Sequence, residues 1–156
     1  MPATLQIPEE RLTQLKQISH AFGGLSLPAT FGQMIRELVH AGIIDCPSIP
    51  NIDIKAAPDG LAIRFDDGEY VAFKSAAAKA LIASLRQYAD VPDPQNPLPI
   101  VINKDSNFTI ARKVRAVKIT IPALSTDAIT KTLSPDLASD FADLIEAALK
   151  NVTIEV

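Results

Sequence analysis

A short alternating stretch at the amino terminus, with no partner strand near it in the chain, constrains this sequence more than any other feature. Ala3, Leu5 and Ile7 alternate with the polar residues Thr4 and Gln6, which is the period of two typical of a β-strand. The next strand-like stretch does not begin before residue 52. Because a lone strand leaves its backbone groups without hydrogen bonds, this one must pair with a distant sheet or with a second copy of itself.

Two amphipathic helices are predicted after this strand. The first begins after Pro8 with acids in its first turn, where the helix dipole favours them, and ends at Gly23. Thr30, followed three residues later by Gln33, has the spacing of a capping box and predicts the start of the second helix. Apolar residues at helical spacing give each helix one apolar face: Leu12, Leu15, Ile18 and Phe22 in the first, and Phe31, Met34, Ile35, Leu38 and Val39 in the second.

The residues at the two helix starts resemble a known family. Ile7-Pro8-Glu9-Glu10 matches the start of the first helix, and Thr30 with Ile35-Arg36-Glu37-Leu38 matches the second helix, of the ribbon-helix-helix DNA-binding proteins. In that family two chains pair their strands into an antiparallel ribbon that enters the major groove of DNA, and the four helices form the dimer core. The resemblance covers about the first third of the chain. It implies a homodimer that binds double-stranded DNA as a transcriptional or plasmid- or phage-type regulator.

Four residues are the predicted DNA-binding residues. Thr4 and Gln6 occupy the polar face of the strand, and the Gln6 amide is suited to a bidentate pair with adenine. The free backbone amides near Thr30 and Phe31, at the predicted start of the second helix, would hold a phosphate. Because forty-odd residues bury too small a core to stand alone, we also expect residues 1–46 to form the dimer.

The charge is distributed unevenly along the chain, whose net charge is −3. Residues 1–46 carry three basic and four acidic side chains, which is no basic footprint for DNA. Residues 100–120 carry five basic side chains against one acid: Lys104, Arg112, Lys113, Arg115 and Lys118 against Asp105. Alternation within one strand would place Arg112 and Lys118 on the same side and Lys113 on the other. This basic run is either a solvated hairpin or a surface that follows phosphates.

The run from Cys46 to Asn51 holds two prolines, which marks a boundary between residues 1–46 and a second domain, residues 47–156. The second domain is predicted as two strand-strand-helix units in tandem, with both helices covering one face of an antiparallel sheet, so the fold class is α+β. The predicted strands are Ile52–Ala57, Leu61–Phe65, Glu69–Lys74, Ile100–Asn103, Phe108–Ile121 and Val152–Val156, and the predicted helices are Ala76–Ala89, capped by Ser75, and Pro135–Lys150.

Composition excludes several classes of protein. A hydrophobic fraction of 47% with a single cysteine is that of a globular protein without a disulfide framework. The chain begins with no secretory signal and holds no apolar run of the roughly 20 residues that span a bilayer, so we expect a cytoplasmic protein with no membrane partner. We expect no enzyme, cofactor or metal, since the one helical pairing of candidate ligands is Glu37 with His40.

Two other functions are compatible with the same sequence. The opening segment would build a homodimer interface in a protein-interaction module that does not bind DNA. Residues 47–156 would alternatively form a ligand-sensing domain, since some regulators of the resembled family carry one. The sequence names no ligand for such a domain.

Overall fold

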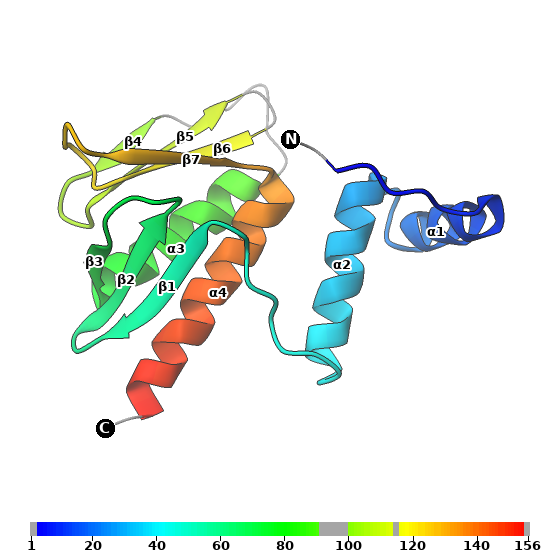
Figure 1. The fold of residues 1–156 in the computed structure, drawn as a ribbon, viewed down its shortest axis with the longest axis horizontal. Coiled ribbons are helices and arrows are strands. Elements are labelled where there is room, and N and C mark those ends of the chain that lie inside the picture. The colour runs from blue at the N-terminus through cyan, green and yellow to red at the C-terminus, as the bar shows by residue number, and fades with distance from the viewer. Residues whose placement is uncertain (1–2, 91–99, 114–115, 155–156) are drawn as a thin grey trace. The chain divides into compact units, whose positions relative to one another are not determined.

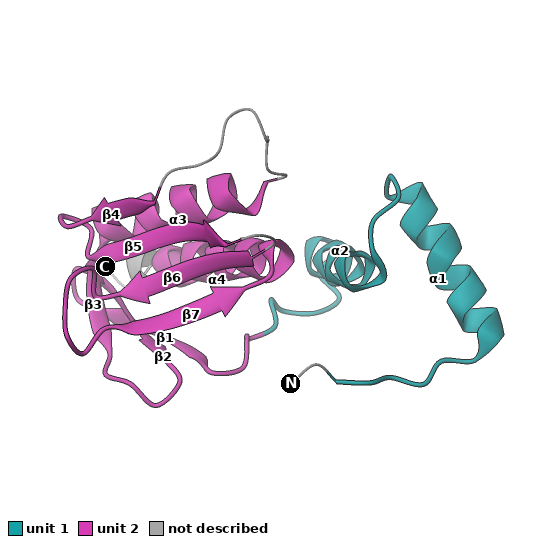
Figure 2. Ribbon diagram, turned by 90° about the horizontal axis from the view of Figure 1, so that it is seen from above, with its two compact units in different colours: residues 1–47 teal, residues 48–156 magenta. Residues whose placement is uncertain are grey.

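The computed structural model describes residues 3–90, 100–113 and 116–154, and the chain divides into two compact units (Figure 2). The amino-terminal unit is residues 1–47 and the carboxy-terminal unit is residues 48–156. The sequence-based boundary lies one residue earlier.

The amino-terminal unit consists of two helices, α1 (Glu9–Ala21) and α2 (Leu27–His40), preceded by a drawn-out segment (Figure 1). α1 begins directly after Pro8 with two acids in its first turn. Gly23 and Gly24 follow the helix at φ angles of 91° and 85°, a region that glycine adopts without a steric penalty. The predicted start and end of the first helix are therefore confirmed.

The predicted strand over Ala3–Ile7 is not formed, so the first regular element among the described residues is the helix α1. Residues 3–8 have no regular secondary structure, and the described part of the chain contains no strand that pairs with them. The physical reason is that a strand is defined by hydrogen bonds to a neighbouring strand, which a single chain does not supply here.

The predicted start of the second helix at Thr30 is also wrong. α2 begins at Leu27, and Ser26 is its N-cap, whose Oγ accepts a hydrogen bond from the amide of Ala29 at 3.3 Å. Pro28 lies in the first turn, where its missing N–H costs nothing. Ser26 and Pro28 thus start the helix one turn before the capping-box pattern.

The carboxy-terminal unit contains seven strands and two helices among its described residues. Its three-stranded sheet has the order β1-β2-β3 and its four-stranded sheet the order β4-β5-β6-β7, and all neighbouring strands are antiparallel. The elements are β1 (Ile52–Ala57), β2 (Gly60–Phe65), β3 (Val71–Lys74), α3 (Ser75–Ala89), β4 (Val101–Asn103), β5 (Phe108–Lys113), β6 (Ala116–Ile121), β7 (Ile129–Leu133) and α4 (Pro135–Ile154).

The α+β class and the first three-strand meander are as predicted, whereas several details differ. Residues 108–121 form a hairpin of two strands rather than one long strand. β7 was not predicted, and Val152–Ile154 continue α4 instead of forming a strand. Residues 155 and 156 lie outside the described residues. Ser75 is the first residue of α3 and not its cap.

The two helices pack against each other and against two sheets, where the sequence predicted a single sheet (Figure 1). Alternating residues of both sheets and one face of each helix form one apolar core. The ring of Phe141 on α4 lies edge-to-face against that of Phe65 on β2, with centroids 5.9 Å apart. Arg86 on α3 bridges Asp143 and Glu146 on α4 at 3.1 and 2.9 Å, at the surface of the same helix pair.

Candidate functional site

The segment before α1 is open to solvent on both of its faces. Thr4 and Gln6, the predicted base-contacting residues, are exposed, and Leu5 between them is 70% exposed. Ile7 is half-buried. Thr4 and Gln6 lie two residues apart on a backbone without strand partners, so they are accessible but not held in a fixed orientation by a sheet.

The apolar faces of α1 and α2 are incompletely covered. α1 has no buried residue, and the buried residues of α2 are Thr30 and Gly32. No apolar side chain is buried among the described residues of the amino-terminal unit, since the buried apolar residues begin at Ile49. The large apolar side chains that are exposed in this unit are Leu5, Phe31, Ile35, Leu38, Ile43 and Ile44.

Thr30 does not offer a free backbone amide. Its N–H donates to the carbonyl oxygen of Ser26 at 2.8 Å, and its hydroxyl donates to the same oxygen at 2.8 Å. Phe31 lies one residue further into the helix. The prediction that free amides at Thr30 and Phe31 hold a phosphate is therefore wrong, because the helix starts earlier. Within the described residues no hydrogen bond joins Thr4 or Gln6 to Thr30 or Phe31.

The basic run of the carboxy-terminal unit is divided between the two faces of the four-stranded sheet. Arg112 points to the core side, where its Nη1 donates to the carbonyl oxygens of Tyr88 and Asp90 at 2.6 Å each. These carbonyls lie at the carboxy-terminal end of α3. The last carbonyl oxygens of a helix have no N–H partner within the helix, so they accept hydrogen bonds from other donors. Lys113 and Lys118 are exposed on the other face, and Arg115 lies outside the described residues.

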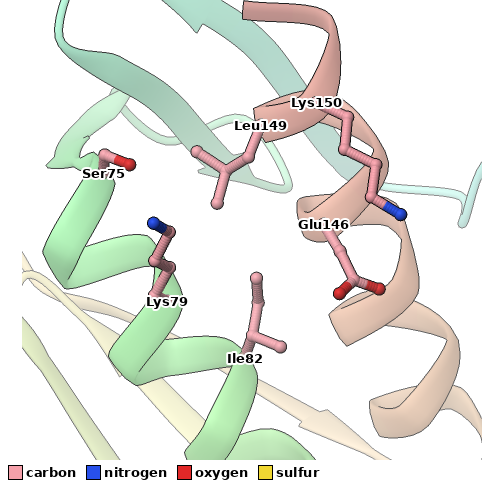
Figure 3. A pocket seen from close by; sticks show the side chains of 6 residues that line it. All are labelled: Ser75, Lys79, Ile82, Glu146, Leu149 and Lys150. Atoms are coloured by element: carbon pink, nitrogen blue, oxygen red, sulfur yellow. The ribbon is translucent and has the colours of Figure 1, made fainter. Parts of the chain in front are cut away.

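A cleft of about 360 Å³ lies between the start of α3 and the end of α4 (Figure 3). Ile82 and Leu149 point toward each other across it. Glu146 at its edge accepts a hydrogen bond from Arg86, which lowers the pKa of the Glu146 carboxyl below its ordinary value. The lining residues are Ser75, Lys79, Ile82, Glu146, Leu149 and Lys150.

Among the described residues, no group of three or more His, Cys, Asp or Glu side chains is placed to hold a metal ion. None of the described helices combines the length and the apolar character that crossing a membrane requires.

Comparison with models of known protein families, with curated proteins and with solved structures gave no match to this chain.

The sequence alone did not show that Arg112 and Lys118 lie on opposite faces of the sheet. A count of alternating residues along one strand assigns both to the same face. The turn between β5 and β6 reverses the alternation, so that Lys113 pairs with Ala116 and Ala111 with Lys118. Sequence reasoning located the basic run but assigned the wrong faces to its members.

Proposed function

We propose that this chain is a homodimeric DNA-binding protein whose paired amino-terminal segments enter the major groove, in the manner of the ribbon-helix-helix proteins. The observation that carries the proposal is the incompleteness of the amino-terminal unit. Its described residues bury no apolar side chain, and the segment before α1 has no strand partner.

A second copy of the same unit supplies what is missing. Antiparallel pairing of residues 3–7 with their symmetry mates would satisfy the strand backbone and place Ala3, Leu5 and Ile7 of both chains on one face. The exposed side chains of α2, including Ile35 and Leu38, would then pack against their counterparts. A second copy of the unit would both pair with residues 3–7 and cover the exposed apolar side chains of α2. This favours a homodimer over a complex with an unrelated protein.

The opposite face of the paired segments is polar and carries Thr4 and Gln6 from each chain. In B-DNA the major groove admits a two-stranded ribbon, and a glutamine amide pairs in a bidentate way with adenine. A threonine offers a hydroxyl group and a methyl group to the edge of a thymine. Gln6 is therefore the proposed base-contacting residue, and Thr4 the proposed auxiliary one.

A second candidate function is a homodimerisation module that does not bind DNA. The charge of the amino-terminal unit favours it, because Arg11, Lys16 and Arg36 are outnumbered by four acidic side chains. Arg36 also donates to Gln33 at 3.3 Å within α2. The two candidates share the dimer and differ in whether Thr4 and Gln6 contact bases.

Titration of the full-length protein against duplex DNA of random sequence, at low and moderate salt, separates the two. Binding that weakens steeply with salt is expected from a DNA-binding protein, because phosphate contacts release counterions. Selection of the duplex sequences that the parent protein prefers then provides the DNA on which the variants are compared. We expect Gln6→Ala to leave folding and dimerisation intact and to remove sequence preference.

The double variant Thr4→Ala/Gln6→Ala is compared with Thr126→Ala/Gln87→Ala, in which the same residue types are changed at exposed positions of the carboxy-terminal unit. The first is expected to lose about 1 to 3 kcal/mol of discrimination for each lost bidentate pair, and the second to bind like the parent. Unaltered affinity of the Thr4→Ala/Gln6→Ala protein for every duplex would leave the segment as a dimer interface alone.

A further inference from the structure

The outer face of the four-stranded sheet is the face turned away from α3 and α4. In Figure 2 the four strands lie in front of the two helices. The inner face carries buried residues such as Phe108, Val117 and Leu133. Strand register and alternation assign the remaining side chains to the outer face: Ile102, Thr109, Ala111, Lys113, Ala116, Lys118, Thr120, Thr130 and Thr132.

This outer face carries two lysines and no carboxylate, although the whole chain has a net charge of −3. Asp105 and Asp127, the acids in the turns of this sheet, follow β4 and precede β7. Antiparallel connectivity puts those turns at the end of the sheet opposite the β5–β6 turn, where Lys113 lies. The lysines are thus separated along the strands from the two acids in these turns.

Lys113 and Lys118 are neighbours on this face. Lys113 pairs with Ala116, and Lys118 follows two residues later on the same side of β6. Such diagonal positions have Cα atoms about 7 to 8 Å apart. Along a DNA strand this distance spans about two phosphate charges, given one charge per roughly 3.4 Å of axis.

The other side chains of the outer face are mostly small, and several of its hydroxyl groups form hydrogen bonds within the protein. The hydroxyls of Thr120 and Thr130 share a hydrogen bond of 2.9 Å, and Thr109 donates to the carbonyl oxygen of Ala123 at 3.1 Å. No aromatic side chain is among the assigned outer-face residues, so the face offers no platform on which unpaired bases stack. Ala111 and Ala116 beside the lysines permit a close approach by a rigid backbone.

We propose that this outer face contacts the phosphate backbone of duplex DNA through Lys113 and Lys118. The inference rests on the proposed DNA-binding function and adds a second contact to it, outside the amino-terminal unit. It supplies positive charge that the amino-terminal unit lacks. Contacts to phosphates provide affinity without sequence readout. Arg112 takes no part in this contact, since its guanidinium group is bonded to the end of α3 on the opposite face.

The test compares two double variants of the full-length protein. Lys113→Gln/Lys118→Gln removes the two outer-face charges, and Lys79→Gln/Lys150→Gln removes the same amount of charge at exposed positions on α3 and α4. For each protein the association constant for one duplex is measured over a series of salt concentrations. Circular dichroism melting checks that both variants remain folded.

Loss of two phosphate contacts in each subunit, four in the proposed homodimer, is expected to reduce the slope of log K against log salt concentration by about 3.6, at roughly 0.9 for each contact. The Lys79→Gln/Lys150→Gln protein is expected to keep the parental slope. An unchanged slope in Lys113→Gln/Lys118→Gln, or an equal reduction in both variants, would overturn the assignment of this face while leaving the proposed function standing. Absence of any salt-dependent binding by the parent protein would overturn both.

Discussion

The two units of this chain use similar sequence patterns to different ends. Phe141 in the carboxy-terminal unit is fully buried, whereas Phe31 on the apolar stripe of α2 is 37% exposed. Both residues lie on helices with apolar side chains at three- and four-residue spacing. The difference teaches that an amphipathic helix specifies a face to be covered, and that the covering surface need not belong to the same chain.

The carboxy-terminal unit covers its helices from several sides. α3 and α4 contact each other and both sheets, so that side chains far apart in sequence form one core. The amino-terminal unit has one helix pair and no sheet among its described residues. Since small units bury a small fraction of their surface, we expect the amino-terminal unit to depend on the proposed second copy for its stability.

The largest effect is expected from a charge placed on the exposed stripe of α2. Leu38→Asp should abolish dimerisation, because an unpaired charge in an apolar interface costs several kcal/mol. Light scattering should then give 16.7 kDa for the variant and twice that mass for the parent. Gln17→Asp, at an exposed polar position of α1, is the control and should remain dimeric. A Leu38→Asp protein that still dimerises would exclude α2 from the interface.

A core truncation tests the other side of the comparison. Phe141→Ala should lower the free energy of unfolding by about 3 to 5 kcal/mol, because it leaves a cavity against Phe65. Urea denaturation should show this loss at every protein concentration. Phe31→Ala is the matched variant, and its loss should depend on protein concentration because its partner surface belongs to a second chain. Equal, concentration-independent losses would mean that both helices are covered within one chain.

The local elements of the carboxy-terminal unit were predictable because their signals are local. The turns at Pro58-Asp59-Gly60 and Asp66-Asp67-Gly68 separated the first three strands correctly, and the apolar period located both helices. β7 was missed because Lys131 interrupts its apolar alternation. In the folded chain that lysine is paired with Asp66 at 2.9 Å, a partner 65 residues away that no local pattern identifies.

The candidate site was predictable to a smaller extent. Thr4 and Gln6 are exposed, but Ala3 and Leu5 beside them are exposed too, so the predicted alternation of buried and exposed side chains is not seen. The contact of Thr4 and Gln6 with DNA stays a prediction. The capping-box pattern at Thr30 competed with Ser26 and Pro28, and the earlier pair starts the helix. The face on which each side chain of the basic run lies depends on where the β5–β6 hairpin turns. Reading the hairpin as one strand moves every side chain after the turn to the other face.

A smaller effect distinguishes structural from surface cations within the basic run. Arg112→Met should lower the free energy of unfolding by about 1.5 to 3 kcal/mol, because it removes charged donors from two carbonyl oxygens at the end of α3. Lys113→Met, the neighbouring and exposed position, should stay within about 0.5 kcal/mol of the parent. Urea denaturation measures both. Similar losses in the two variants would show that Arg112 does not stabilise the fold through α3.

The smallest effect concerns the ion pairs at the surface of the α3–α4 pair, and it tests whether the carboxy-terminal unit depends on its core rather than on surface charge. Arg86 lowers the pKa of Glu146 in the folded protein. A carboxyl group with a lowered folded-state pKa stabilises the fold above its unfolded-state pKa, which is about 4.3 for glutamate. That contribution is lost as the pH falls through the folded-state value.

Arg86→Met should therefore be less stable than the parent at pH 7, and the difference should shrink as the pH falls below about 4. Because Arg86 and Glu146 are both more than two-fifths exposed, solvent screening limits the difference at pH 7 to about 1 kcal/mol or less. Urea denaturation at several pH values measures it, with Glu146→Gln as a second variant that should reduce the same pH dependence. A difference that is equal at pH 7 and pH 3 would assign the role of Arg86 to the packing of its aliphatic side-chain carbons rather than to its charge.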